Sequence, residues 1–301
     1  MSNYKNDINR RQFIEAGLKT AGAAALLTIP SINSFAAPRE YTVNDIIEII
    51  YKEIPGAGFN RATVDTIKSG AGLAKVNGVV ATMFPTIEVI RKTIAMNVNF
   101  IIAHGDTYYN YADDINWAGS SKVVRQKQQL LADNGITIWR FHDNWHDHRP
   151  DGILYGVLKK LDWLKYNKDA EKTFLIPPAP LKQIVDRLRT SLAIEHVRVI
   201  GDLSASCEKI TLLPGAWAGQ NQIKRIDTDA PDVLIVGELH EWETAEYIRD
   251  ARLLGSKTSL VVLGHSVSEE PGMEYLVEWL QPKLEGLKVT HIASNNPFTW
   301  V

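Results

Sequence analysis

The sequence predicts an α/β protein with two α/β domains and mainly parallel or mixed sheets, and two observations predict it. From Tyr41 onward, short runs of β-branched and aromatic residues alternate with stretches whose apolar residues recur at helical spacing. Such alternation favours a mainly parallel sheet with right-handed crossovers. The prolines of the stretch Leu175–Pro178 are typical of a domain joint. We therefore expect a first domain over residues 37–170 and a second over residues 171–301.

The first domain should contain three helices and three strands. Helical periodicity ends before Pro55 in the first helix and at Asn134-Gly135 in the third, because proline and glycine break helices. The apolar runs between the helices are short, which predicts buried strands. In chain order, the expected elements are a helix over 43–54, a strand over 78–83, a helix over 86–96, a strand over 100–103, a helix over 121–133 and a strand over 137–141.

The second domain should continue the alternation. Its last helix is expected to begin with Ser268 as the N-cap, because serine is favoured there. Glu269 would then lie in the first turn, and Pro271 at a position where a missing N–H does no harm. In chain order, the expected elements are a helix over 181–192, strands over 196–202, 210–215 and 233–237, a helix over 241–254, a strand over 260–264 and the helix after Ser268.

Three of the expected strands each end at a histidine, and these are His104, His142 and His265. The second and third are followed, four residues on, by His146 and Glu269. Ligands of open α/β sheets bind at the carboxyl ends of the strands, and imidazole and carboxylate groups are metal ligands. One such histidine would ordinarily be a core or surface residue. Three in the same relative position predict a metal site.

The first 36 residues have the pattern of a cleavable export signal. Arg10-Arg11, one free position and Phe13-Ile14 fit the twin-arginine pattern, and Ser34-Phe35-Ala36 offers small residues to a signal peptidase. The apolar stretch over residues 20–29 is too short to span a bilayer stably. We expect cleavage near Ala37 and a periplasmic protein with no stable membrane insertion. The alternatives are a disordered basic N-terminus or an uncleaved anchor.

Bulk properties argue against several classes of protein. Loss of the first 36 residues would remove four basic and two acidic residues, which leaves 29 basic and 33 acidic residues and a net charge of −4. That balance disfavours nucleic-acid binding, which depends on neutralising phosphates. Cys207 is the single cysteine, so no intrachain disulfide can form. The sequence has no Walker loop and no GxGxxG motif after a strand, so no nucleotide cofactor is implied.

Four motifs in order give the chain a family resemblance. Ile101–Asp106 stands where the family has a strand leading to His-His-Pro, and Ile138–His146 where it has a strand and then His-Thr-Asn-Leu-Asp. Val233–Glu238 is similar to a Val-x-Ile-Thr-Gly-Glu stretch, and Gly264–Glu269 to Gly-His-x-x-x-Glu. The chain thus resembles the Nif-three-like dinuclear-metal proteins, often labelled GTP cyclohydrolase I type 2-like. The resemblance covers nearly all of the chain after the signal.

The resemblance implies a metal centre in the interior of a ring-shaped hexamer with the Nif-three-like fold. The intact family positions are His104 and His265, which would bind one metal, and Glu269, which would bridge two. The C-terminal segment, about residues 255–301, would return these last ligands to the site. The expected cofactors are one or two divalent ions per chain, of zinc, iron or manganese.

Two positions depart from the family pattern. Gly105 replaces the second histidine of the pair, which removes a ligand, and Asp106 is the nearest carboxylate that could compensate. His146 replaces an aspartate of the other metal and keeps a metal-competent group. A mononuclear centre and an altered dinuclear centre both remain open.

Further groups near these motifs suggest acid–base chemistry. We expect His142 to act as a general base or to position another group, since neutral imidazole titrates near working pH. A histidine that only bonds to the backbone is the alternative. Glu238 follows a strand and could supply an acid. Glu241 is more simply explained by the preference of helix N-termini for acidic residues.

The sequence supports two functions of different classes. One is a metal-dependent hydrolase of a small substrate, such as a phosphorylated or heterocyclic compound. The other is a metal-binding scaffold or regulatory protein without turnover, which the loss of a ligand at Gly105 favours. Whether the chain is an enzyme is left open.

Overall fold

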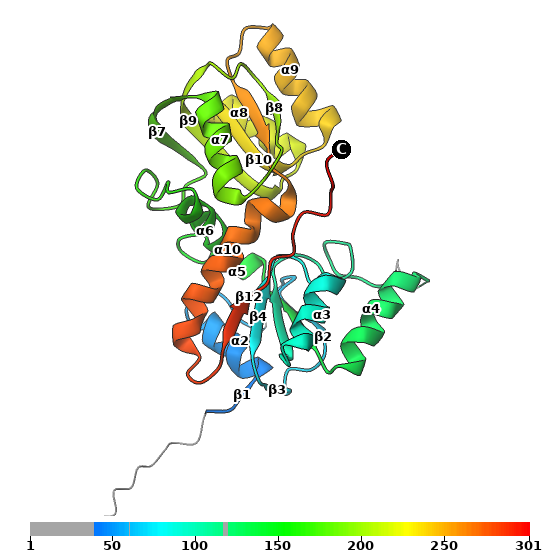
Figure 1. The fold of residues 1–301 in the computed structure, drawn as a ribbon. Helices are drawn as coiled ribbons and strands as arrows, with labels where there is room; N and C mark the ends of the chain where they lie inside the picture. Colours follow the sequence, from blue (N-terminus) through cyan, green and yellow to red (C-terminus); the bar gives the residue numbers. More distant parts are fainter. Residues whose placement is uncertain (1–38, 60, 117–119) are drawn as a thin grey trace, which may run out of the picture. The chain divides into compact units, whose positions relative to one another are not determined.

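Two five-stranded sheets organise the structure, a computed structural model that describes residues 39–59, 61–116 and 120–301 (Figure 1). Both sheets belong to one unit, Arg39–Val301. The expected export signal over residues 1–36 lies outside the described residues. Among the residues that are described, no helix has both the length and the apolar character that a membrane span needs.

The first sheet has the strand order β12-β4-β5-β6-β2. The first four strands are parallel, and β2 pairs antiparallel with β6 at the edge. A separate two-stranded ribbon, β1 with β3, leads into helix α2 and the sheet. The elements of this half are β1 (Tyr41–Thr42), α2 (Val43–Tyr51), β2 (Ile67–Ser69), β3 (Lys75–Val76), β4 (Val79–Thr82), α3 (Ile87–Ala95), β5 (Phe100–Ala103), α4 (Lys122–Asp133), β6 (Thr137–Arg140), α5 (Asp143–Asp147) and α6 (Gly152–Lys160).

The second sheet has the strand order β7-β9-β10-β11-β8. Its three inner strands are parallel, and both edge strands run antiparallel to their neighbours. Its elements are β7 (Thr173–Pro180), α7 (Leu181–Leu192), β8 (Arg198–Ile200), β9 (Ser206–Ala216), α8 (Gly219–Asp229), β10 (Val233–Glu238), the π-helical turn η1 (Glu241–Ala245), α9 (Glu246–Leu253) and β11 (Ser259–Val262).

Helix α10 (His265–Leu280) contacts both sheets, because it packs on β9 and β10 of the second and on β4 and β12 of the first. After the short turn η2 (Gln281–Lys283), the chain adds β12 (Val289–His291) to the edge of the first sheet, beside β4 (Figure 1). The C-terminal segment therefore begins in the second sheet and ends in the first.

Successive residues of β5 belong to different apolar cores. Phe100 and Ile102 lie in the main core, whereas Ile101 and Ala103 lie in a second core with residues of α3 and α4. Side chains alternate between the two faces of a strand. A strand covered on both faces must therefore be apolar at every position, which is why this run has no polar residue until it ends at His104.

The predicted α/β class with mainly parallel and mixed sheets is confirmed. The helices expected over 86–96 and 121–133 begin one residue later than predicted, because Thr86 and Ser121 are their N-caps and each hydroxyl accepts a bond from the backbone N–H three residues on. The prolines expected at a joint, Pro177 and Pro178, instead lie inside strand β7. β7 is an edge strand whose pairing with β9 is irregular between Leu175 and Ala179, and an edge tolerates residues that cannot donate to the ladder.

The expected start of the last helix is wrong. Helix α10 begins at His265, after an N-cap Gly264 with φ +107°. The Ser268 hydroxyl, expected to cap the helix, donates to His265 O at 2.7 Å and accepts from Gly215 N at 2.9 Å. It therefore ties the helix to strand β9. Pro271, expected near the first turn, lies inside the helix.

Candidate metal centre

Three histidines converge at the carboxyl edge of the first sheet. His104 follows β5, His142 follows β6, and His146 lies in α5, which continues from His142. Since β5 and β6 are adjacent and parallel, their carboxyl ends meet at one edge. Each residue offers one ring nitrogen, and the three nitrogens lie within 4.8 Å of one another. Two nitrogen ligands of one tetrahedral zinc ion lie about 3.4 Å apart, given Zn–N bonds of about 2.1 Å, so the rings would move inward on binding an ion.

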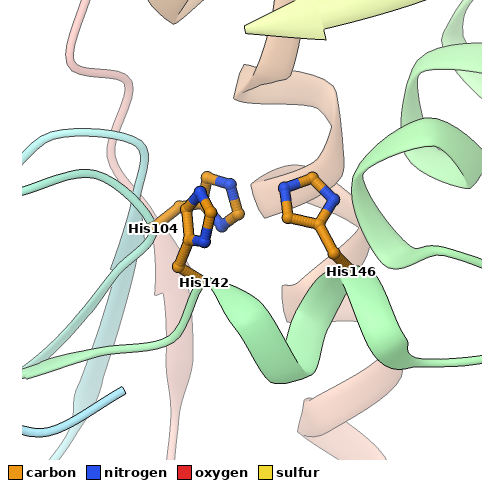
Figure 2. Close-up of side chains that lie close together, drawn as sticks. All are labelled: His104, His142 and His146. Carbon is orange, nitrogen blue, oxygen red and sulfur yellow. The ribbon is translucent and has the colours of Figure 1, made fainter. Parts of the chain in front are cut away.

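The rings enclose a common space. His104 and His142 are stacked, with centroids 4.5 Å apart and planes 24° apart. His146 stands edge-on to both, at 5.0 and 4.9 Å. Figure 2 shows the stacked pair on one side and His146 opposite.

Each of the three rings directs its Nδ1 atom at an oxygen acceptor. A carbonyl or carboxylate oxygen only accepts, so in the neutral ring Nδ1 carries the proton and Nε2 keeps its lone pair. Outer partners of this kind fix the tautomer and orientation of metal-binding histidines. The pairs are His104 with Phe141 O at 3.1 Å, His142 with Asp143 Oδ1 at 2.9 Å and His146 with Asp151 Oδ2 at 3.1 Å.

The Nε2 atom of His104 is buried and has no hydrogen-bond partner among the described residues. The nearest carboxylate oxygen that it faces is Glu269 Oε2, at 3.9 Å. A buried polar atom left unpaired costs about 1–3 kcal/mol. A divalent ion would satisfy this lone pair, so the donor set fits a metal.

The protonation of two of the histidines suits metal binding. Burial lowers the pKa of His104, and the neighbouring imidazoles of His142 and His146 lower it further. Burial also lowers the pKa of His142. Both rings are therefore neutral at neutral pH, and neutral imidazole is the form that binds metals. For His146, burial is outweighed by the hydrogen bond and charge of Asp151, which raise its pKa.

Asp65 holds helix α5 and its histidines in place. The N-cap residue of this short helix, His142, provides no side-chain cap. The buried carboxylate of Asp65 accepts instead from the backbone N–H groups of His142, Asp143 and Asn144 at 2.8, 2.9 and 2.9 Å. These are the donors that a helix N-terminus leaves unpaired. Asp65 therefore fixes where His142 and His146 point.

Helix α10 brings a second group of titratable side chains to the same place. His265 and Glu269 are one helical turn apart, and His265 Nε2 lies 3.2 Å from Glu269 Oε2. On the other side of the ring, His265 Nδ1 lies 3.4 Å from Glu238 Oε2. Burial opposes the charge on His265, but the two carboxylates outweigh it and raise the pKa of His265 to about 10. His265, in turn, lowers the pKa of Glu238.

A cavity of about 840 Å³ opens onto the centre. His142, His146, His265 and Glu269 line it, whereas His104 lies beneath its surface. Another part of its wall comes from strand β9, the loop after it and the first turn of α8. The residues of that wall are Leu212, Pro214, Ala216, Trp217, Ala218 and Asn221. The volume is in the range of small-molecule sites.

The structure brings together five of the residues expected at the site: His104, His142, His146, His265 and Glu269. His142, expected to act as a base or positioner, offers a ring nitrogen to the three-histidine group. Of the two others, Asp106 lines the cavity outside that group, and Glu238 contacts the centre only through His265.

Sequence reasoning missed three residues that shape the centre. Asp65 and Asp151 hold the histidines, and Phe84 packs on Gly105. A signal existed for Asp151 alone, since it follows His146 closely in the chain. Asp65 and Phe84 reach the site only through the fold.

Comparisons with known proteins agree with this architecture. The family model described as Duf34/NIF3 (NGG1p interacting factor 3) matches residues 41–297. A protein of Clostridium perfringens, named GTP cyclohydrolase 1 type 2 homolog, is 23% identical over 276 residues, covering 86% of this chain and 99% of the relative. The Bacillus cereus protein related to NIF3 superposes with a TM-score of 0.68 at 16% identity, covering 88% and 100% of the two chains. Reduced HcgD from Methanocaldococcus jannaschii gives a TM-score of 0.58 at 20% identity, covering 84% and 98%.

Proposed function

The chain belongs to the Duf34/NIF3 family, and from this premise we propose that it is a metal-dependent hydrolase of a small substrate. The observation that carries the proposal is the convergence of three histidine nitrogens, one of them a buried and unpaired Nε2, beside a cavity of about 840 Å³. The name of the Clostridium perfringens relative, a homologue of a cyclohydrolase, is compatible with hydrolysis of a heterocyclic or phosphorylated compound.

We assign the holding of one divalent ion to His104, His142 and His146, with Glu269 reaching the same ion from α10. Three imidazoles and a carboxylate suit zinc, and also iron or manganese. Such an ion would polarise a substrate oxygen and lower the pKa of a water molecule. His265 fixes the carboxylate of Glu269 through its Nε2, and Glu238 fixes His265 through Nδ1.

Proton transfer needs a group at the cavity wall. Asp106 lines the cavity next to the backbone of Gly105. We assign it the uptake of the proton from the attacking water, since carboxylates serve as general bases within hydrogen-bond reach of the substrate. The aromatic face of Trp217, which also lines the cavity, would bind an apolar or planar part of the substrate.

The test has two parts, because a metal-binding protein without turnover is the second candidate. Metal-depleted protein is reloaded with zinc, iron or manganese, and bound metal is measured by elemental analysis. Turnover is then screened on phosphoesters, nucleotides and cyclic amides. The control variant is His240→Ala, because His240 is exposed and lies outside the cavity.

An enzyme should show metal-dependent turnover in the wild type and in His240→Ala, but not in His104→Ala. Stoichiometric metal without turnover on any of the three substrate classes would favour the non-catalytic reading. That reading draws support from Gly105, which leaves the centre one histidine short of the family pattern.

We also propose that the protein is exported and assembles as a hexamer. Export rests on the twin-arginine pattern and would give a mature N-terminus near Ala37 by mass spectrometry of the periplasmic fraction. The hexamer rests on the family resemblance, and light scattering that gives the mass of one chain would contradict it.

A further inference from the structure

Gly105 has no room for a side chain. A Cβ atom built on it would lie 2.2 Å from Cε1 and 2.3 Å from Cδ1 of Phe84, well inside van der Waals contact. The backbone cannot easily yield, because His104 N and Gly105 N donate to Thr82 O and Met83 O at 3.1 and 2.7 Å. Phe84 directly follows the second of these acceptors. The Phe84 ring therefore lies directly against the backbone of Gly105.

Phe84 occupies the flank of the centre next to His265. The two rings meet edge to face, with centroids 5.3 Å apart and planes 70° apart. Phe84, Asp106 and His265 line both the 840 Å³ cavity and a neighbouring cavity of about 600 Å³. Phe84 is thus an apolar part of the wall between two cavities, placed where a side chain from position 105 would otherwise extend.

The side chains left on this flank are too few for another ion. Metal sites of this kind use at least three protein ligands. His265 Nε2 and Glu269 face each other, but Glu238 approaches the opposite nitrogen of the ring and cannot share an ion with them. Asp106, which also lines this wall, belongs to no group of three ligand atoms among the described residues. Within residues 39–59, 61–116 and 120–301, the three-histidine group is the one set of three ligand atoms close enough for an ion.

We infer that this centre holds a single divalent ion and that Phe84, packed on Gly105, excludes the second ion that the family resemblance implies. The inference rests on the proposed metal binding. It adds the number of ions bound per chain and the structural reason for that number. Two features act together here: Gly105 offers no ligand side chain, and an apolar ring that cannot coordinate fills the space that such a side chain would need.

The test replaces Phe84 and Gly105 together and measures how many metal ions each chain binds. The double variant Phe84→Ala/Gly105→His removes the ring and supplies an imidazole beside His104. Each protein, in its oligomeric state as purified, is equilibrated with zinc or cobalt, and metal per chain is measured by elemental analysis. Cobalt-loaded samples also report, by electron paramagnetic resonance, whether two ions lie close enough to couple.

Wild-type protein and Phe84→Ala should bind one ion per chain, and Phe84→Ala/Gly105→His should bind two, with a coupled cobalt signal. The matched control Phe84→Ala/Gly105→Leu fills the same space without a ligand and should bind one. Gly105→His alone should melt at a lower temperature than the wild type, because its side chain meets Phe84.

Two tightly bound ions in the wild type would overturn the inference, and this measurement needs no variant to fold. A folded double variant that still binds one ion would overturn the role of Phe84. If the wild type binds no ion, the proposed metal function fails instead, and the inference falls with it.

Discussion

The two groups of side chains that meet at the centre are built differently. On the first sheet, burial keeps His104 and His142 neutral, and each of the three histidine rings has one nitrogen fixed by an oxygen, of the Phe141 carbonyl or of the Asp143 and Asp151 carboxylates. The other group is a row of alternating charges, Glu238 of β10 with His265 and Glu269 of α10, of which His265 and Glu269 line the cavity. Buried neutral imidazoles bind a cation without first losing a proton. The difference supports the proposal that the sheet edge supplies most of the ligands of the ion and that α10 adjusts its binding through Glu269.

The largest expected effect is on the sheet side. His104→Ala removes a ligand that is fully buried and leaves two imidazoles. Zinc affinity should fall by at least about 100-fold, more than the loss of an outer partner costs. Competition with a chromophoric chelator measures this. His240→Ala, an exposed histidine, should leave the affinity unchanged, and equal metal binding in both variants would contradict the assignment.

The next largest effect should come from Asp65, which orients both His142 and His146. Asp65→Ala leaves three backbone N–H groups at the start of α5 without their acceptor. We expect an affinity loss of about 10- to 100-fold and a loss of unfolding free energy of about 3 kcal/mol. Chelator competition and urea unfolding measure the two quantities. Asp65→Asn keeps one acceptor oxygen and should recover part of both; if Asp65→Ala binds zinc as the wild type does, Asp65 does not position the site.

His265→Ala should have a smaller effect on affinity, of about tenfold, because His265 acts through Glu269. The same competition assay, run on His104→Ala and His265→Ala side by side, compares how much the histidines of the first sheet and the side chains of α10 contribute to zinc affinity. A loss as large as that in His104→Ala would show that His265 binds the ion itself. The division between holding and adjusting would then be wrong.

The smallest change should come from Glu238→Gln, because Glu238 acts on the ion only through His265 and then Glu269. Zinc affinity should change by about twofold or less, since the exposed contact is screened by solvent. In the metal-free protein, however, the pKa of His265 should fall from about 10, because a carboxylate that favours the imidazolium is removed. An NMR titration of the ring protons measures it. Glu241→Gln, whose carboxylate pairs with Arg198, is the control and should leave that pKa unchanged.

Much of the fold and of the centre could be predicted from the sequence. The predictions that were wrong, or were not made, have physical causes. Apolar runs that end at His104 and His142 predicted the sheet edge because both faces of those strands are buried. The start predicted for the last helix is too late, because serine is a residue type that favours an N-cap. In the structure, the Ser268 hydroxyl bonds instead to strand β9. Local residue type could not reveal that contact.

The cap of α5 and the block at Gly105 could not be predicted for a related reason. Asp65 lies far from α5 in the chain and is brought to it by the fold, where β2 pairs with β6. Gly105 is visibly a missing ligand, but the sequence does not show that Phe84 fills the space. A gap in a motif can be read from a sequence, whereas the residue that occupies the gap depends on the assembled sheets.

The return of the chain to the first sheet sets an order for biosynthesis. Strand β12 closes that sheet beside β4, and Glu269 and His265 arrive on the helix just before it. Domains usually form from the N-terminus while the ribosome is still at work. Here almost the whole polypeptide must be synthesised before the outer strand of the first sheet, β12, can pair. The N-terminal part of the chain, which carries the three histidines, therefore cannot complete its sheet until the C-terminal part has been synthesised.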